Sequence, residues 1–156
     1  MGSCCGITTR SKATVCLECR AEGKPVGLKT LQHLVIEEKR GAIGDGNYYF
    51  CATPDCPVVY YNAEGSVTFH KEDLTIKVGL KETDPTIPVC YCFNITEEDI
   101  REEIRKTGRS TASQRIRSEI KARSCACEIN NPSGRCCLGD VGKVEKRLLQ
   151  ERRNAA

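Results

Sequence analysis

Short runs of hydrophobic and aromatic residues separated by turn sequences occupy the first half of the chain, and they predict β-strands. Residues 48–50 (Tyr-Tyr-Phe) and 58–61 (Val-Val-Tyr-Tyr) are rich in side chains that favour strands. The sequence Asn-Ala-Glu-Gly at 62–65 is typical of a turn and leads into residues 67–69, so we expect a β-hairpin there.

Three further segments of this half have weaker patterns. Leu74, Ile76 and Val78 alternate with polar residues, which predicts another half-buried strand. Residues 28–36 fit either a short helix or a strand. Residues 81–88 contain an Asp-Pro and an Ile-Pro step without a helical period, so we predict a linker.

The second half of the chain has the three- and four-residue spacing of helices. Thr96, followed three residues later by Asp99, resembles a capping box at the start of a helix. We expect Gly108 to end that helix and Asp140 to cap the last one. The hydrophobic faces of the three predicted helices are Ile100 with Ile104, Ile116 with Ile120, and Val141 with Val144 and Leu148.

These patterns divide the 156 residues into two parts. We predict an α+β protein with a small, β-rich mixed subdomain at 12–82 and a helical subdomain at 88–152. Aromatic residues are scarce, with three Phe, five Tyr and no Trp, so each part alone buries little apolar surface. Domains of this size often need a bound metal to fold, and this directs attention to the cysteines.

Twelve cysteines are the strongest chemical feature of the sequence. They can be disulfide partners, metal ligands or reactive thiols. The first residues lack the features of a secretory signal, and no apolar stretch approaches the roughly 18 residues that span a bilayer. We therefore expect a cytoplasmic protein without membrane insertion, in which thiols stay reduced and paired cysteines favour metal over disulfide.

One set of four cysteines has the spacing of a zinc site. The two pairs, C-x2-C at 16–19 and C-x4-C at 51–56, fit a closed tetrahedral site with a structural role. Thiolates are soft ligands, so they also admit Cu(I) or iron, and His33 is an alternative to one cysteine. The expected zinc ligands are Cys16, Cys19, Cys51 and Cys56.

A second set suits a 2Fe–2S cluster, which needs four thiolates that converge from separate segments. The pair Cys90 and Cys92 is followed more than thirty residues later by Cys127 and Cys137, with short predicted helices between them. Cys125 is an alternative to Cys127. We expect Cys92 and Cys137 to lie just before helices, where free backbone N–H groups and the helix dipole favour an anionic cluster.

The formal net charge of +3 counts every thiol as neutral. A zinc ion with four thiolates carries about −2, and so does an oxidised 2Fe–2S cluster with four thiolates. The loaded protein therefore carries a charge of about −1, and the electrostatic reason to expect a nucleic-acid partner disappears.

Several of these segments resemble a known family. Val-Cys-Tyr-Cys at 89–92 and Asn-Pro-Ser-Gly-Arg-Cys-Cys at 131–137 resemble the bacterioferritin-associated-ferredoxin type of 2Fe–2S domain, and more specifically the N-terminal domain of CopZ-type copper chaperones. The upstream cysteines, with Tyr-Phe at 49–50 and Val-Tyr at 59–60, match the same domain. The resemblance covers about residues 15–148 and implies a zinc subdomain joined to a helical, bacterioferritin-associated-ferredoxin-like 2Fe–2S subdomain.

The resemblance also implies a role in copper handling, with a cluster that supplies an electron for the reduction of Cu(II) to Cu(I). Full-length CopZ-type chaperones have a separate copper-binding domain with an M-x-C-x-x-C motif, and this sequence contains no such motif. Either the sequence ends before that domain, or a partner binds the copper, or the metal delivered is not copper.

Four cysteines remain outside the two sets. Cys4 and Cys5 are adjacent and form a candidate site for a soft cargo metal such as Cu(I); the alternative is a tail with incidental thiols. We expect Cys136, next to Cys137, to be buried or to donate a local hydrogen bond. Cys125 is a substitute ligand or a third-site thiol.

The leading hypothesis is a cytoplasmic zinc and 2Fe–2S protein of metal homeostasis that traffics copper and transfers an electron. Its partner would be a copper-transporting ATPase, a separate copper-binding domain or another redox protein. The alternatives are a ferredoxin-like electron-transfer protein without metal delivery and a regulatory interaction module. The sequence shows no Ser-His-Asp set, phosphate-binding glycine loop or open metal site with a general base, so catalysis is limited to at most a cluster-mediated metal reduction.

Overall fold

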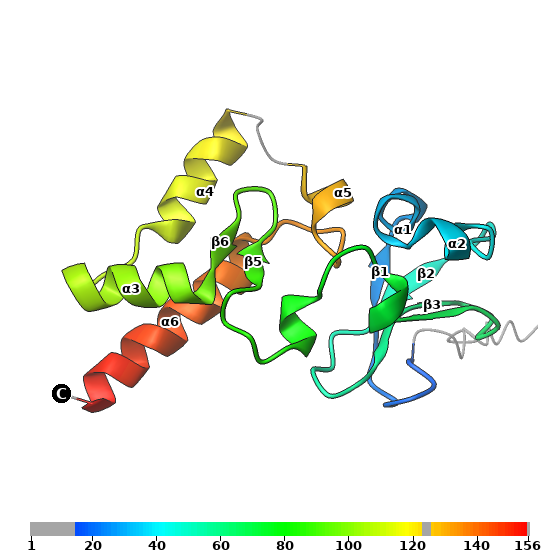
Figure 1. Cartoon of the computed structure of the whole chain (residues 1–156), viewed down its shortest axis with the longest axis horizontal. Coiled ribbons are helices and arrows are strands. Elements are labelled where there is room, and N and C mark those ends of the chain that lie inside the picture. Colours follow the sequence, from blue (N-terminus) through cyan, green and yellow to red (C-terminus); the bar gives the residue numbers. More distant parts are fainter. Residues whose placement is uncertain (1–14, 123–125, 156) are drawn as a thin grey trace, which may run out of the picture.

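The computed structural model describes residues 15–122 and 126–155. A sheet with two short helices lies at one end of the molecule, and three longer helices lie at the other end (Figure 1). This mixture of sheet and helix agrees with the predicted α+β class. The sheet region contains β1 (Lys24–Val26), α1 (Leu28–Leu34), α2 (Glu37–Arg40), β2 (Tyr48–Phe50), β3 (Val58–Asn62) and β4 (Thr68–His70).

The four strands form an antiparallel sheet in the order β1-β2-β3-β4, and β3 is buried along its whole length. Side chains of a strand point alternately to the two faces of a sheet, and here a bulge between Val58 and Tyr60 shifts that alternation. Val59 and Tyr60 pack into the hydrophobic core of the sheet region, together with Leu31 of α1. Val58 and Tyr61 pack instead against three cysteines. Strand β3 therefore separates the hydrophobic core from a cysteine-rich face.

Residues 28–36, which fit either a helix or a strand, form helix α1 over most of their length. The strand predicted at 74–78 is wrong: residues 71–73 form a short 3-10 helix, η1 (Lys71–Asp73), and Leu74 makes a single bridge to Val35. The backbone beside Leu74 is the end of α1, which offers no extended edge for a longer pairing. Leu74 and Val78 are nevertheless buried, as their alternation indicates.

A second set of elements forms the helical region. After the 3-10 turn η2 (Gly79–Lys81), these are β5 (Pro88–Cys90), β6 (Ile95–Thr96), α3 (Glu97–Thr107), α4 (Ala112–Lys121), α5 (Cys127–Asn130) and α6 (Leu138–Ala155). Strands β5 and β6 pair as a small antiparallel hairpin. The isoleucines of α3 and α4 pack around Cys90 and Cys137 together with Val141 and Leu148 of α6, so these cysteines belong to the helical core.

The predicted ends of α3 are confirmed. The Asp99 backbone N–H donates to the Thr96 hydroxyl at 3.0 Å, and the Thr96 N–H donates to the Asp99 carboxylate at 2.9 Å. Gly108 ends the helix with a left-handed φ of +79°. Asp140, by contrast, does not cap α6: it lies in the first turn, because the Val141 N–H already bonds to the Cys137 carbonyl at 2.9 Å.

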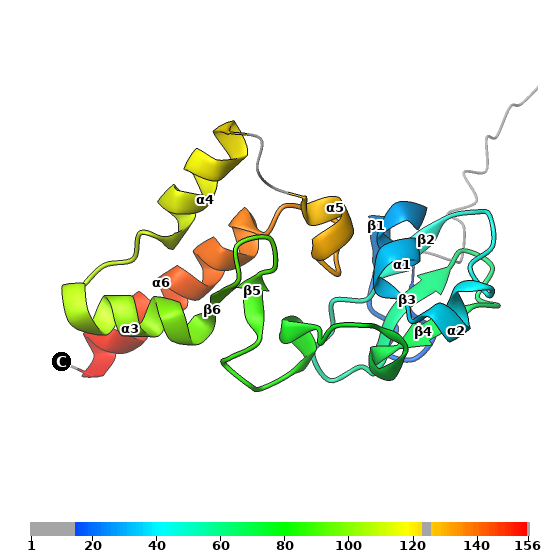
Figure 2. The ribbon, with the colours of Figure 1, turned by 45° about the horizontal axis from the view of Figure 1, so that its top comes forward.

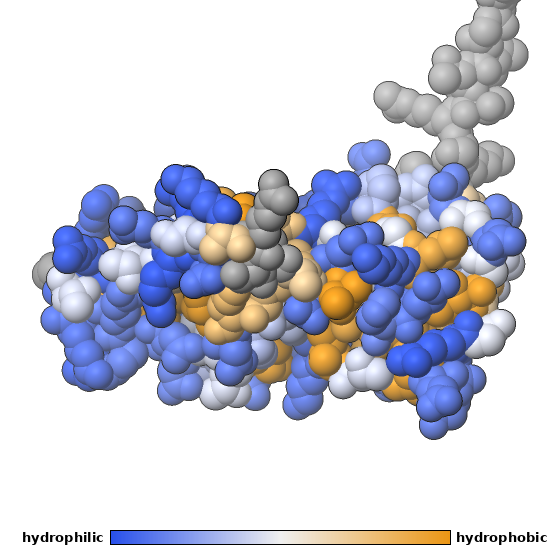
Figure 3. All heavy atoms as spheres, turned by 90° about the horizontal axis from the view of Figure 1, so that it is seen from above, coloured by the Kyte–Doolittle hydropathy of each residue, from blue (hydrophilic) through white to orange (hydrophobic). Residues whose placement is uncertain are grey.

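The two regions meet where α5 lies beside α1, as both ribbon views show (Figures 1 and 2). Seen from above, hydrophilic side chains cover most of the helical end, and hydrophobic ones show towards the middle of the face (Figure 3). Within residues 15–122 and 126–155, no helix is both long and apolar enough to cross a bilayer.

Candidate metal centres

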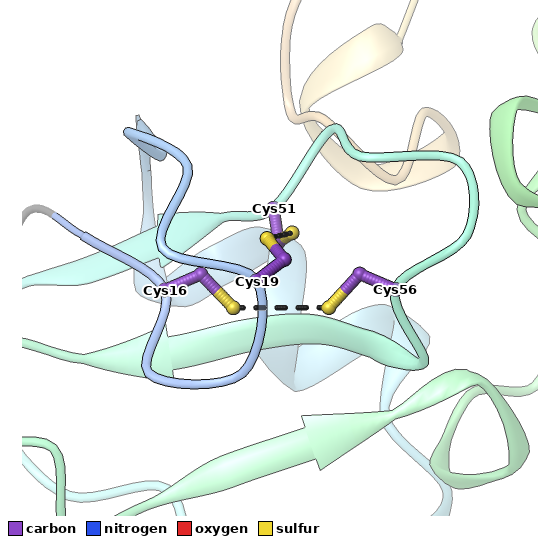
Figure 4. A group of neighbouring side chains, drawn as sticks. All are labelled: Cys16, Cys19, Cys51 and Cys56. Atoms are coloured by element: carbon purple, nitrogen blue, oxygen red, sulfur yellow. Dashed lines mark hydrogen bonds between the residues drawn. The ribbon is translucent and has the colours of Figure 1, made fainter.

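Four cysteines of the sheet region converge at one point (Figure 4). Cys16 and Cys19 lie in the loop before β1, and Cys51 and Cys56 lie in the connection between β2 and β3. Their sulfur atoms are all within 4.8 Å of one another, with Cys16 to Cys56 at 3.8 Å and Cys19 to Cys51 at 3.6 Å. A Zn–S bond of about 2.3 Å gives a tetrahedron edge of about 3.8 Å, so this donor set fits zinc.

The loop of the first two cysteines is built by its own backbone. Cys16 donates its N–H to the Ala21 carbonyl and accepts from the Arg20 N–H, both at 2.9 Å. Arg20 has a left-handed φ of +64°, which closes the turn. The N–H groups of Cys19 and Glu18 also bond to the Cys16 sulfur. Such N–H···S bonds stabilise a thiolate, the form that binds metal.

The thiols of this site differ in acidity. Burial alone would raise the pKa of Cys19, but hydrogen bonds with the Thr53 hydroxyl and the Ala21 N–H lower it to about 6. Burial raises the pKa of Cys56 to about 12 and also raises the pKa of Cys16. Metal binding therefore displaces protons from the more buried thiols.

Lys81 supports the site from the start of the segment predicted as a linker. Its side chain is buried, and its ammonium group donates to the carbonyls of Thr53 at 2.7 Å and Cys56 at 3.0 Å. The lysine thus ties down the loop that carries two of the four thiols, and no spacing or motif in the sequence identifies it. His33, the alternative ligand, bonds through Nδ1 to the Lys29 carbonyl at 2.8 Å and does not belong to the cysteine group.

The four cysteines of the second set lie in two close pairs. Cys90 ends β5, Cys92 lies in the turn before β6, Cys127 begins α5, and Cys137 precedes α6. The Cys137 thiol donates to the Cys90 sulfur at 2.9 Å, and the sulfurs of Cys92 and Cys127 lie 3.4 Å apart. Cys127 also interacts with Cys137, which lowers the pKa of Cys127 and links the two pairs. All nine cysteines that the structure describes are free thiols.

Cys92 differs from the other three, which are buried, because it is partly exposed. Its sulfur accepts hydrogen bonds from the Ala126 N–H at 3.3 Å and the Asn130 amide at 3.7 Å. The prediction that Cys92 lies just before a helix is wrong, because the chain first turns back to pair Ile95 with Cys90. Cys137 does directly precede a helix, as expected.

Mutual hydrogen bonds set the acidity of these thiols. The bond with Cys137 lowers the pKa of Cys127 to about 5 and that of Cys90 to about 7. Both bonds, together with burial, raise the pKa of Cys137, the donor. Cys90 and Cys127 therefore favour the thiolate form inside an apolar core, whereas burial raises the pKa of Cys92. Four cysteine sulfurs are the donor type of soft-metal and iron–sulfur sites.

The remaining cysteines have mixed outcomes. Cys136 is exposed rather than buried, but its thiol does donate a local hydrogen bond to Cys127. Cys4 and Cys5, the candidate cargo site, lie outside the described residues, and so does Cys125, the alternative cluster ligand.

Three comparisons with known proteins agree with one another. The zinc-binding domain family of CopZ (zf_CopZ) matches residues 13–75, which include all four cysteines of the first set. The copper chaperone CopZ of Archaeoglobus fulgidus is 38% identical over 122 residues, or 78% of this chain and 57% of that protein. The chain thus spans a little over half the length of that relative.

The third comparison is with a solved structure, the X-ray structure of the N-terminal domain of Archaeoglobus fulgidus CopZ. It has a TM-score of 0.70 and 34% identity, and the match covers 83% of this chain and 96% of that domain. The match to zf_CopZ and the cysteine geometry identify a zinc-binding domain with a Cys4 site. Because the similarity extends over nearly the whole solved domain, the chain belongs to the family of CopZ N-terminal domains.

Proposed function

We propose that this chain is a zinc and 2Fe–2S protein of copper homeostasis, in which zinc is structural and the cluster transfers an electron. Residues 12–82 form the zinc subdomain and residues 88–152 the cluster subdomain. The zinc ligands are Cys16, Cys19, Cys51 and Cys56, and the cluster ligands are Cys90, Cys92, Cys127 and Cys137.

The observation that carries the cluster assignment is the meeting of four thiols from separate segments. Cys90 and Cys137 are separated by 46 residues in the chain, yet their sulfurs lie 2.9 Å apart in the helical core. Cysteines that only fill space have no reason to place their sulfurs together, and a pair of disulfides is absent from this group. Four converging thiols are the ligand set of a 2Fe–2S cluster.

When bound, the cluster supplies one reversible electron. Cys92 is the partly exposed ligand, so the edge of the site at Cys92 is the side on which an electron acceptor can approach. Copper would be the substrate, and a cluster held by Cys90, Cys92, Cys127 and Cys137 would supply the electron that reduces Cu(II) to Cu(I). The likeness to a copper chaperone supports copper as that substrate.

Soft Cu(I) produced in this way needs a thiolate-rich acceptor. We infer that a separate copper-binding domain or a copper-transporting ATPase takes the ion in the cytoplasm. A nucleic-acid partner is not part of the proposal, because the thiolate charge of two loaded sites cancels the formal charge of +3.

Metal analysis tests the cluster assignment. Protein purified without oxygen should contain about two iron, two sulfide and one zinc per chain, and reduction should produce an electron paramagnetic resonance signal. Cys137→Ser should lose iron but keep zinc, whereas the neighbouring Cys136→Ser should keep both. Wild-type protein without iron and sulfide, or a Cys137→Ser variant with full iron content, would show that the assignment is wrong.

Copper reduction tests the function. Protein reduced with dithionite and freed of excess reductant is mixed with Cu(II) and a chelator that absorbs only with Cu(I). We expect about one Cu(I) per cluster, with recovery of the oxidised cluster spectrum. A cluster that stays reduced in the presence of Cu(II) contradicts the copper role and leaves the ferredoxin-like alternative.

A further inference from the structure

The loop that carries Cys127 and Cys137 rests on the sheet region through two buried side chains. Thr30 of α1 is fully buried, and its hydroxyl donates to the Glu128 carbonyl at 2.6 Å. Tyr60 of β3 is also fully buried, and its hydroxyl donates to the Pro132 carbonyl. Both hydrogen bonds join residues about 70 to 100 positions apart in the chain, so they hold the two regions together.

Close packing makes this contact specific. A Cβ atom on Gly134, which has a left-handed φ of +68°, would lie 2.7 Å from the Thr30 hydroxyl oxygen and 3.1 Å from Val26. Asn131 shapes the same turn, because its amide donates to the Arg135 carbonyl at 2.8 Å and its oxygen accepts a backbone N–H within the turn. The loop before Cys137 is therefore preformed and seated directly on α1.

The other two cysteines of this set are attached to the same scaffold. Tyr91, between Cys90 and Cys92, accepts from the Gly79 N–H at 2.8 Å and donates to the Lys77 carbonyl at 2.7 Å. The same segment ends at Lys81, whose ammonium group donates to two carbonyls in the connection between β2 and β3. The segment of Cys90 and Cys92 and the loop of Cys127 and Cys137 are thus both hydrogen-bonded to the part of the chain that precedes β5.

Strand β3 connects the zinc site with this interface. It begins just after Cys56, and the carbonyl of Val59 accepts from the Cys51 N–H at 2.8 Å. Tyr61 packs against the zinc cysteines, and the adjacent Tyr60 holds Pro132. Disorder in the connection that carries Cys51 and Cys56 would therefore affect the loop of Cys127 and Cys137 through β3.

We propose that Thr30 and Tyr60 are positioning residues for the cluster site, and that zinc, by ordering β3, slows the loss of the cluster. This inference rests on the proposed function, because it requires a cluster at the second set of cysteines. Where zinc raises the equilibrium affinity for the cluster, thermodynamic linkage makes a bound cluster raise the affinity for zinc by the same factor.

Hydroxyl-deletion variants test the positioning role. Tyr60→Phe and Thr30→Val each remove the hydroxyl that donates to a carbonyl of the loop, so we expect release of iron to a chelator to be about fivefold faster than in wild type. Matched controls remove a hydroxyl bond inside the sheet region. Tyr48→Phe loses the bond from the Gly44 N–H, and Thr75→Val loses the bond to the Leu34 carbonyl.

The readouts separate positioning from general destabilisation. Zinc content should stay at wild-type level in all four variants, while the visible circular dichroism of the cluster should change only in Tyr60→Phe and Thr30→Val. Iron release at the control rate in these two variants overturns the inference. A wild-type protein that never acquires iron overturns the proposed function instead, so the two failures are distinguishable.

Zinc removal tests the linkage. A zinc chelator added to wild-type holoprotein should accelerate bleaching of the cluster absorption, and this acceleration should shrink in a variant with both Tyr60→Phe and Thr30→Val. Bleaching at the same rate with and without zinc contradicts the coupling. Equal acceleration in wild type and the double variant contradicts the role of these two side chains.

Discussion

Replacing Gly134 by alanine is the sharpest test of the contact between the two regions. Gly134 has a φ of +68°, and the added Cβ would lie 2.7 Å from the hydroxyl oxygen of Thr30. That hydroxyl is engaged with the Glu128 carbonyl at 2.6 Å, so it moves away only by giving up its hydrogen bond. The substitution therefore combines backbone strain with a steric conflict.

The two costs can be separated. A left-handed conformation costs a non-glycine residue about 1–2 kcal/mol. Overpacking at a tight contact costs about 1–3 kcal/mol more. Gly108→Ala isolates the first cost, because Gly108 has a similar φ of +79° and its nearest neighbour is the flexible end of Arg152 at 3.6 Å. We expect Gly134→Ala to lose about 2–5 kcal/mol and Gly108→Ala about 1–2 kcal/mol.

Urea unfolding of the zinc-loaded protein, followed by far-ultraviolet circular dichroism, measures both losses. In a Thr30→Ala background the excess loss of Gly134→Ala over Gly108→Ala should shrink, because the conflicting oxygen is gone. The reasoning is refuted if Gly134→Ala costs no more than Gly108→Ala, since that result means that the loop does not rest on α1.

Three further predictions concern the metal sites and the helical region. Lys81→Met should release zinc to a chelator on the order of tenfold faster, because the loop at Cys56 loses its ammonium donor. Lys77→Met, at an exposed position, should release zinc at the wild-type rate, and equal rates in the two variants would contradict the role of Lys81. Zinc affinity should fall by about tenfold per pH unit on acidification for each thiol that must lose a proton, since burial raises the pKa of Cys56 to about 12. Chelator competition at about pH 7.5 and about pH 6.5 measures the affinity, and a pH-independent affinity would be inconsistent with protonated thiols in the metal-free site. Glu145→Gln should lower the free energy of unfolding by about 1 kcal/mol, because the Glu145 carboxylate accepts hydrogen bonds at the start of α4. The donors are the Ser113 N–H at 2.9 Å and the Ser113 hydroxyl at 2.6 Å. An unchanged urea midpoint would contradict that role.

Local signals in the sequence were reliable where the physics is local. The capping box at Thr96 and the stop at Gly108 involve hydrogen bonds within four residues, and both are present. The strand at 58–61 follows from its aromatic and β-branched side chains. The strand predicted at 74–78 is wrong because pairing needs a neighbouring edge, and the alternation of Leu74 and Val78 reports burial alone.

The two sets of cysteines illustrate the same limit. Spacing groups Cys16 with Cys19 and Cys90 with Cys92, because the members of each pair are two or three residues apart in the chain. Spacing cannot show that the Cys90 and Cys137 sulfurs approach to 2.9 Å, because that distance depends on how β5 packs against α6. The hydrogen bonds of Lys81 and Tyr60 have no local sequence signal, since their partners are backbone carbonyls in distant segments.

The sequence by itself determined the elements and the chemistry of this protein: short strands with a hairpin, helices with readable ends, and paired thiols suited to metal. These features depend on interactions between residues close in the chain. The tertiary structure decided which thiols meet, which lysine holds the zinc loop, and how the loop of Cys127 and Cys137 rests on α1 and β3. The reason is that long-range packing places side chains from separate segments together, and no short pattern along the chain records that placement.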